Sequence, residues 1–208
     1  GFELSLTHII CVIGLKPTYS RISRHGLIAY GSSFDCIGIF SQSVVDNALV
    51  LEVMAGADEY DSTVSTKSVP SYSSLLKPPK QLKIAYINDT IEAEGLNEEV
   101  KQHTLDALNR IKSEGHTVEG VDFSMLKDVL PTYYILTTAE SSSNLSRYDG
   151  VRYGMRSANT TDLASMYKKT RSEGFGKEVQ RRIMLGTFVL SASYYDAYYT
   201  KAQKVRRL

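Results

Sequence analysis

Metal ligation is the first chemistry to test, because the residues that bind transition metals are few in this chain. The histidines and cysteines are His8, His25, His103, His116, Cys11 and Cys36. None of them stands in a C-x-x-C or H-x-x-x-H spacing, the patterns that bring neighbouring ligands to one ion. We therefore expect no metal site.

Serines could supply a nucleophile, and they cluster at 32–33 and 141–143. A serine attacks a carbonyl efficiently only with a base within hydrogen-bonding reach, and no local motif provides that pair. Gly174 and Gly176 lack the G-x-x-x-x-G-K-[ST] pattern of a phosphate loop and indicate a helix end followed by a helix start. Residue types and spacing alone therefore assign no catalytic residue.

The first third of the chain is expected to contain strands, one helix and a loop, and these elements would have to position any functional site there. Short apolar runs between glycines at 9–40 predict strands and tight connections. Ser41 or Ser43 is the expected cap of a buried, apolar helix that ends at Gly56. Residues 61–81 contain three prolines and are expected to form a surface loop.

The segment 82–130 has the clearest pattern, a strand, a helix and a second strand. Residues 82–87 alternate as a strand does, and Asn97 is the expected cap of a helix that Gly115 ends. Residues 117–123 supply the next strand. This order predicts a right-handed βαβ unit with parallel strands.

The last third of the chain has a helical pattern. Pro131 is expected in the first turn of a helix that runs to about Tyr148. A second helix is expected to begin at 161–162 and to end at Gly174. Residues 176–208 predict one or two long helices with a tyrosine-rich middle that suits packing.

Composition excludes several classes of protein. With 42% hydrophobic residues and a net charge of +1, the chain is not expected to be disordered. No apolar run reaches the roughly 18 residues of a membrane span, and two cysteines favour a reducing compartment, so we expect a cytoplasmic protein with no membrane partner. The charge divides into −7 over residues 1–146 and +8 over 147–208, which solvated helix faces explain more simply than RNA binding.

Three stretches resemble the amidase signature family. Residues 14–19 (GLKPTY) are similar to the segment that follows its catalytic serine. Residues 139–154 (AESSSNLSRYDGVRYG) and 173–199 resemble the A subunits of tRNA-dependent glutamyl/aspartyl-tRNA amidotransferases within that family. The resemblance implies an α/β fold, with a mixed central sheet flanked by helices and a helix-rich C-terminal portion.

The resemblance runs from about Val12 to Arg207, and we expect residues 1–208 to be an interior fragment of one amidase signature domain. Within it, residues 1–60 would follow the catalytic-serine loop and 61–81 would form the surface loop. Residues 82–130 would be the βαβ unit and 131–208 the helical portion.

The resemblance also implies a reaction and partners. The A subunits of these enzymes hydrolyse glutamine, and the ammonia passes to the B subunits, which activate misacylated Glu-tRNA(Gln) or Asp-tRNA(Asn) with ATP and Mg²⁺. The expected partners are the amidotransferase B and C subunits, glutamine and, through the complex, tRNA. No cofactor is expected in this chain. Two alternatives stay open, a small-molecule amidase of the same family and a catalytically dead interaction domain.

The catalytic residues of the family are not expected in this chain. Its nucleophile lies in a Gly-Gly-Ser-x-Arg stretch, and counting back from residues 14–19 without gaps places Phe2 at the serine. A phenylalanine cannot attack a carbonyl, and the family's lysine and bridging serine would precede residue 1. Cys36 and Ile39 also replace the usual glutamine and proline. We expect the chain itself to be inactive.

Part of the family's substrate-binding half does have matches here. Arg182 matches the arginine that pairs with the α-carboxylate of glutamine, a task that suits a guanidinium fork, and Tyr133 matches a tyrosine of the same pocket. Four more residues form either a charged cluster near the pocket or a set that fixes the loop after the helix: Arg147, Asp149, Arg152 and Tyr153.

Overall fold

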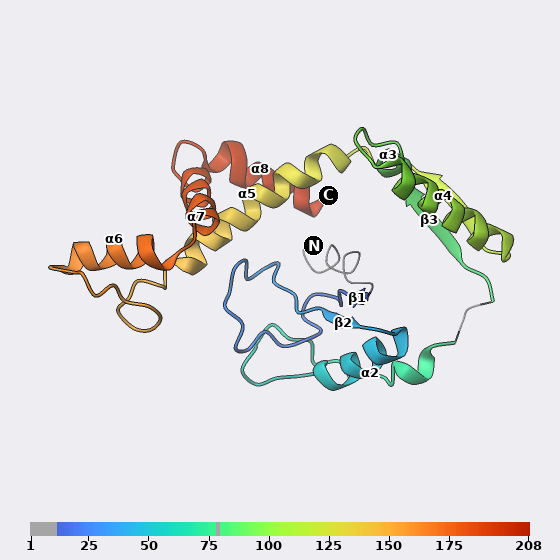
Figure 1. Cartoon of the computed structure of the whole chain (residues 1–208), viewed down its shortest axis with the longest axis horizontal. Coiled ribbons are helices and arrows are strands. Elements are labelled where there is room, and N and C mark those ends of the chain that lie inside the picture. The colour runs from blue at the N-terminus through green and yellow to red at the C-terminus, as the bar shows by residue number, and fades with distance from the viewer. Residues whose placement is uncertain (1–11, 78–79) are drawn as a thin grey trace. The chain divides into compact units, whose positions relative to one another are not determined.

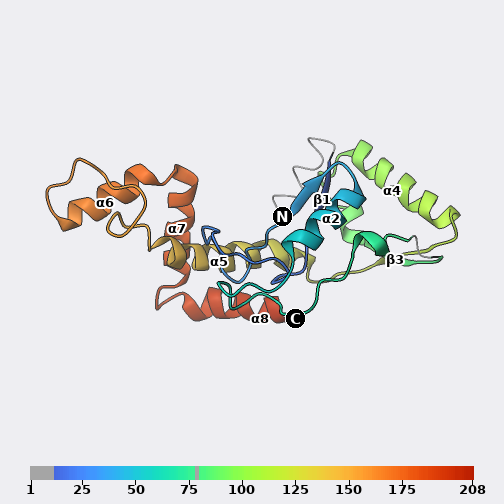
Figure 2. The same ribbon diagram turned by 90° about the horizontal axis from the view of Figure 1, so that it is seen from below.

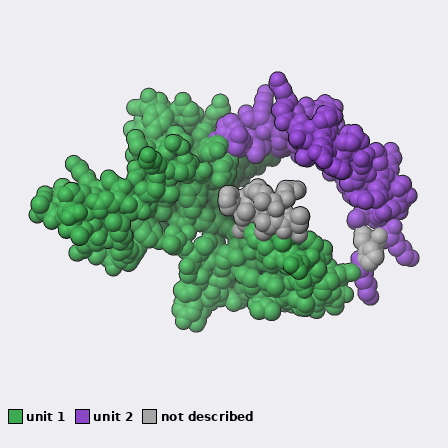
Figure 3. Space-filling view, viewed as in Figure 1, with its two compact units in different colours: residues 1–76, 132–208 green, residues 77–131 purple. Residues whose placement is uncertain are grey.

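The computed structural model describes residues 12–77 and 80–208 (Figure 1). The chain divides into two compact units (Figure 3). Unit 1 consists of Gly1–Leu76 and Thr132–Leu208, and unit 2 of Lys77–Pro131. Unit 1 is therefore built from two segments that are distant in sequence. The predicted nucleophile position, Phe2, lies outside the described residues.

The described part of the first segment of unit 1 contains a two-stranded sheet, one α-helix and a short 3₁₀ helix, η1 (Ser73–Leu75). Strand β1 (Ile13–Leu15) pairs antiparallel with β2 (Ile39–Ser41), and α2 (Val44–Met54) follows. The side chain of Ser43 accepts a hydrogen bond from the backbone N–H of Asp46, which confirms Ser43 as the cap. Three buried residues make the small core of this segment: Ile22, Ile39 and Leu51.

The expectation that α2 is buried is wrong for most of its surface. Only Asn47, Ala48 and Leu51 are buried, whereas Val44 is 55% exposed and Val53 is 87% exposed. Apolar side chains are spread around the helix rather than gathered on one side, and the described residues cover only one side. The helix therefore has more apolar side chains than the described residues of this segment bury.

Unit 2 confirms the predicted strand–helix–strand order and the parallel pairing of its strands. Strand β3 (Lys83–Ile87) pairs in parallel with β4 (Thr117–Val121), and the short α3 (Asn88–Ile91) and the longer α4 (Glu98–Ser113) lie between them. Asn97 caps α4 by accepting from the N–H groups of the second and third residues that follow it.

The second segment is helical, as Figure 2 shows. Helix α5 spans Leu126–Leu145, α6 spans Leu163–Gly174 and α7 spans Lys177–Val189. The chain then passes through a π-helix, η2 (Tyr195–Thr200), into α8 (Lys201–Arg207).

The predicted start of α5 is wrong. The helix begins at Leu126, so Pro131 is its sixth residue rather than part of the first turn. A proline has no backbone N–H, so one hydrogen bond to the preceding turn is missing there. The helix nevertheless continues through Pro131. The capping box of Asp162 with Ser165 confirms the predicted start of α6.

The α/β class is confirmed. The described strands form two separate two-stranded sheets, one antiparallel in unit 1 and one parallel in unit 2, and helices occur in both units. Within the described ranges, no helix is both long and apolar enough to cross a bilayer.

Gly186 sets how closely α7 approaches α5, and this contact generates a first prediction. A Cβ atom at this position would lie 1.9 Å from the carbonyl oxygen of Thr138. We expect Gly186→Ala to lower the free energy of unfolding by about 3 kcal/mol, because a helix backbone must move. Denaturant unfolding measures the change. Gly176→Ala is the control, since no atom lies within 4 Å there, and it should cost less than about 1 kcal/mol. Equal losses would contradict the packing argument.

Ser20 generates a second prediction, because its φ of 70° lies in the left-handed region. Glycine adopts this region without a steric penalty, so Ser20→Gly should raise the free energy of unfolding by about 1 kcal/mol. Ser143→Gly in α5 is the matched control and should lower it by about 0.5 kcal/mol through helix propensity. The urea midpoint measures both changes, and a loss in both variants would show that Ser20 is not strained.

Candidate functional site

The guanidinium of Arg182 is the centre of the candidate site. On α7 its Nε donates to Oε1 of Glu178 at 2.9 Å, one helical turn earlier. Its Nη1 donates at 2.9 Å to the hydroxyl of Tyr30, which comes from the other segment of unit 1. Cζ lies 5.8 Å from the ring centroid of Tyr30 and 5.9 Å from that of Tyr134. The side chain is 27% exposed, so the group is clamped but accessible.

Both charges of this pair are stabilised. The hydrogen bond with Tyr30, followed by that with Glu178, raises the pKa of Arg182 above its ordinary value. The hydrogen bond from Arg182, together with the nearby charge of Arg181, lowers the pKa of Glu178. The site therefore presents a permanent cation at neutral pH.

Tyr133, the other predicted pocket residue, lies near Arg182. Its ring is edge-on to that of Tyr134, with centroids 5.4 Å apart, and it is 44% exposed. Tyr133 is also among the hydrogen-bonding groups that raise the pKa of Arg182. The structure thus brings the two residues together, from α5 and α7.

The loop of residues 30–35, hereafter the 30–35 loop, holds Tyr30 in place. The carboxylate of Asp35 accepts from the backbone N–H of Tyr30 at 2.9 Å and of Gly31 at 3.1 Å. From α5, Nδ2 of Asn144 donates to the carbonyl of Tyr30 at 3.2 Å and to the hydroxyl of Ser32 at 3.0 Å. Both backbone polar groups of Tyr30 are therefore bound.

Two charged side chains bind the same loop at Ser33. The backbone N–H of Ser33 donates to Glu140 of α5 at 2.9 Å, and its hydroxyl also donates to that carboxylate. Arg206 of α8 donates to the Ser33 hydroxyl at 2.8 Å and to its carbonyl at 3.0 Å, and lies 4.0 Å above the ring of Phe34. The loop is thereby fixed to α5, α7 and α8.

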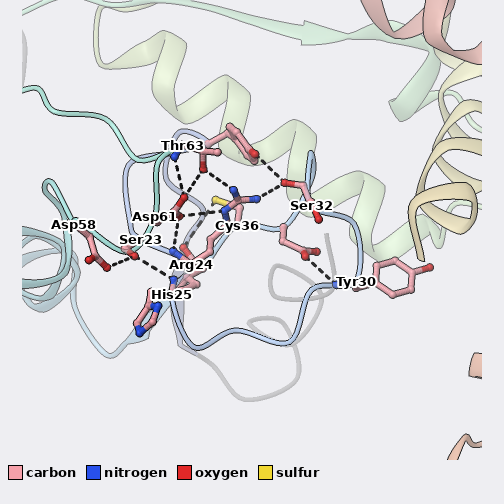
Figure 4. Close-up of polar contacts among 12 residues, drawn as sticks. Ser23, Arg24, His25, Tyr30, Ser32, Cys36, Asp58, Asp61 and Thr63 are labelled. Atoms are coloured by element: carbon pink, nitrogen blue, oxygen red, sulfur yellow. Dashed lines mark hydrogen bonds and ion pairs between the residues drawn. The ribbon is translucent and has the colours of Figure 1, made fainter. Parts of the chain in front are cut away.

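A second polar network, drawn in Figure 4, ties the 30–35 loop to residues 57–64. Arg24 pairs with Asp61 at 3.5 Å and donates to the hydroxyl of Thr63 at 2.5 Å and to the carbonyl of Ser32. Hydrogen bonds from the Thr63 hydroxyl and then the Arg24 backbone lower the pKa of Asp61. A cavity of about 180 Å³ lies against this network.

Ser23 of this network hydrogen-bonds to a carboxylate but shows no sign of activation for catalysis. Its hydroxyl donates to Asp58 at 2.5 Å and accepts from the backbone N–H of His25. The His25 ring instead packs on Tyr60, with centroids 4.8 Å apart. These contacts join residues 23–25 to residues 58–60.

The four residues predicted as a cluster or a loop anchor make separate contacts. Arg147 donates to Oδ1 of Asn144 at 2.9 Å, Asp149 accepts from the backbone N–H of Val151, and Tyr153 packs edge-on against Tyr148. Over residues 12–77 and 80–208, no ion pair joins Asp149 to an arginine. Arg152 is exposed. These contacts favour the loop-fixing alternative, and a direct pocket role stays a prediction.

Sequence reasoning missed Tyr30, Asn144 and Glu140. Tyr30 lies 152 residues from Arg182, and no local spacing marks such a pair. Asn144 and Glu140 lie inside the stretch 139–154 that carries the resemblance, which is the one signal that could have selected them. The described residues contain no group of three histidine, cysteine or carboxylate side chains placed to share a metal ion.

Comparison with curated proteins gives relatives that include A subunits of glutamyl-tRNA(Gln) amidotransferases. The glutamyl-tRNA(Gln) amidotransferase A subunit of Oceanobacillus iheyensis is 55% identical over 198 residues, which are 95% of this chain and 40% of that protein. The protein of the same name from Bacillus licheniformis is 54% identical over 95% of this chain and 41% of its own length. The chain spans about two fifths of the length of these relatives.

Solved structures share the fold. The glutamyl-tRNA(Gln) amidotransferase A subunit from Thermotoga maritima superposes with a TM-score of 0.63 at 33% identity, over 94% of this chain and 37% of that one. A peptide amidase from Stenotrophomonas maltophilia gives 0.58 at 22% identity over 89% and 39%, a likeness of fold alone. A family model described as Amidase matches residues 7–208. Since that match covers nearly the whole chain, this chain belongs to the amidase family.

Proposed function

We propose that this chain is the glutamine-binding part of the A subunit of a glutamyl-tRNA(Gln) amidotransferase. The observation that carries the proposal is the clamped guanidinium of Arg182 beside Tyr133, in a chain 55% identical to a protein of that name. Of the five N–H groups of a guanidinium, Glu178 and Tyr30 accept from two and Tyr133 from a further one, so two stay available. The edge formed by Nη1 and Nη2 keeps donors for a carboxylate, which a guanidinium binds in a bidentate manner.

The complete enzyme would hydrolyse glutamine and deliver the ammonia to misacylated tRNA. In this proposal the chain works in the cytoplasm with the B and C subunits, and ATP and Mg²⁺ belong to the B subunit. In this proposal the chain binds glutamine, and binding needs no cofactor. The attack on the glutamine amide is made by the family's serine nucleophile, for which no match is expected in this chain. The segments 1–60, 61–81, 82–130 and 131–208 would be parts of one amidase signature domain.

A catalytically inactive interaction domain is the second candidate. The exposed apolar residues of α2 favour it, because Val44, Val45 and Val53 are each more than half exposed. Such a domain would bind a protein partner without binding glutamine. A glutamine titration therefore separates the two candidates.

The third prediction is that Arg182→Ala weakens glutamine binding by at least about tenfold, because a charge-assisted bidentate contact is lost. Isothermal titration of glutamine into the 208-residue chain measures the affinity. Arg181→Ala is a matched control, since Arg181 is the neighbouring residue, pairs with the same Glu178 and is 75% exposed. Its affinity should stay within about twofold of wild type. Wild-type and variant titrations without heat would overturn the proposed glutamine site.

The fourth prediction is that the purified chain releases no ammonia from glutamine above the buffer rate. The physical reason is that the count back from residues 14–19 would place Phe2 at the nucleophile position, and a phenylalanine has no group that can attack an amide carbonyl. A coupled ammonia assay measures the rate, with the complete O. iheyensis amidotransferase as the positive control. Ammonia release that scales with the concentration of this chain would show that it carries its own nucleophile.

A further inference from the structure

We propose that Tyr30 is a positioning residue that holds the guanidinium of Arg182 ready for a carboxylate, and that Arg147 acts on this site through Asn144 and Tyr30. The inference rests on the proposed function, because it takes Arg182 as the group that binds the carboxylate of glutamine. It adds residues that act through Arg182 rather than by touching the ligand.

The clamp on Arg182 fixes the two torsions nearest its charge. Glu178 holds Nε and Tyr30 holds Nη1, both at 2.9 Å, so the plane of the guanidinium cannot turn freely. The Nη1–Nη2 edge then keeps one orientation before any ligand arrives. An arginine side chain that is free to move loses rotamer freedom when it binds a ligand. A clamped arginine has already lost that freedom, so it binds a carboxylate ligand with higher affinity.

Tyr30 can act as a clamp only because its own backbone is held. Asp35 accepts its N–H at 2.9 Å, and Asn144 donates to its carbonyl at 3.2 Å. Asn144 is 7% exposed, so its amide has few alternative partners. The hydroxyl of Tyr30 is thus placed by a buried side chain of α5.

Arg147 sets which way the amide of Asn144 faces. An arginine only donates hydrogen bonds, so its Nη2, 2.9 Å from Oδ1 of Asn144, requires the amide oxygen on that side. The amide nitrogen is then directed at the carbonyl of Tyr30. Without Arg147 the amide could turn and place its oxygen against that carbonyl. Arg147 is therefore linked through Asn144 to the backbone carbonyl of Tyr30, and the hydroxyl of the same Tyr30 accepts from Arg182. This set of contacts is hereafter called the relay.

Tyr30→Phe tests the clamp, because it keeps the ring and removes only the hydroxyl. We expect glutamine to bind about tenfold more weakly in an isothermal titration of the 208-residue chain. Tyr72→Phe is a closely matched control: its hydroxyl accepts from Arg21 at 2.9 Å, and Cζ of Arg21 lies 5.8 Å from its ring centroid. That variant should bind glutamine within about twofold of wild type.

Nitrogen-15 NMR of the Arg182 side chain gives a readout that needs no ligand. In the wild-type chain the Nη hydrogens should give separate, slowly averaging signals, because Nη1 is bound to Tyr30. In Tyr30→Phe these signals should merge, whereas Tyr72→Phe should leave them unchanged. Mere loss of stability would not produce this difference at a temperature where each variant is folded by circular dichroism.

The relay is tested with Arg147→Ala, which should weaken glutamine binding about threefold to tenfold and partly merge the same Arg182 signals. Arg207→Ala removes an exposed arginine of unit 1 and should change neither.

The outcomes separate the inference from the proposed function. If Arg182→Ala abolishes binding while Tyr30→Phe binds as wild type does, the positioning role is overturned and the proposed function stands. If the wild-type chain binds no glutamine, the proposed function is overturned, and the NMR signals alone decide the clamp: unchanged signals in Tyr30→Phe overturn it too. If Arg147→Ala behaves as Arg207→Ala does, the relay is overturned.

Discussion

The attachment of the 30–35 loop to three helices is the constraint on which unit 1 depends. Carboxylate, amide and guanidinium groups from α5, α7 and α8 bind the loop at Tyr30, Ser32 and Ser33. Glu140 is partly buried, and a buried charge is tolerable only with its partners in place, so these contacts tolerate little rearrangement. The same attachment brings Tyr30 to Arg182, and it therefore joins the two segments of the unit and shapes the candidate site at once.

Local signals made much of the fold predictable. Ser43, Asn97 and Asp162 each satisfy backbone donors at the start of a helix, and a side chain that can do so is visible in the sequence. The parallel strands of unit 2 followed from the strand–helix–strand order for the same reason, since every part lies within about 40 residues. Arg182 and Tyr133 were selected by resemblance, which spacing alone could not have done.

What was not predictable depends on distant residues. The sequence around Pro131 does not show that α5 begins five residues before it. A proline usually stands in the first turn of a helix, and here it lies inside one. The apolar sequence of α2 indicated burial, but the described residues cover one side only. No sequence pattern marked Tyr30 as a site residue, because its hydroxyl contacts Arg182, which lies 152 positions later in the sequence.

The separation of Ser33 from Arg206 has a consequence for biosynthesis. A ribosome adds about 5–20 residues per second, so the 173 positions that separate them take roughly 9–35 s to synthesise. During that interval the 30–35 loop has been synthesised, but the helix that completes its binding has not. Unit 2, whose strands pair over a short span, can fold meanwhile. The first segment of unit 1 therefore stays without part of its binding partners over this stretch of synthesis, which is when a chaperone would have most to protect.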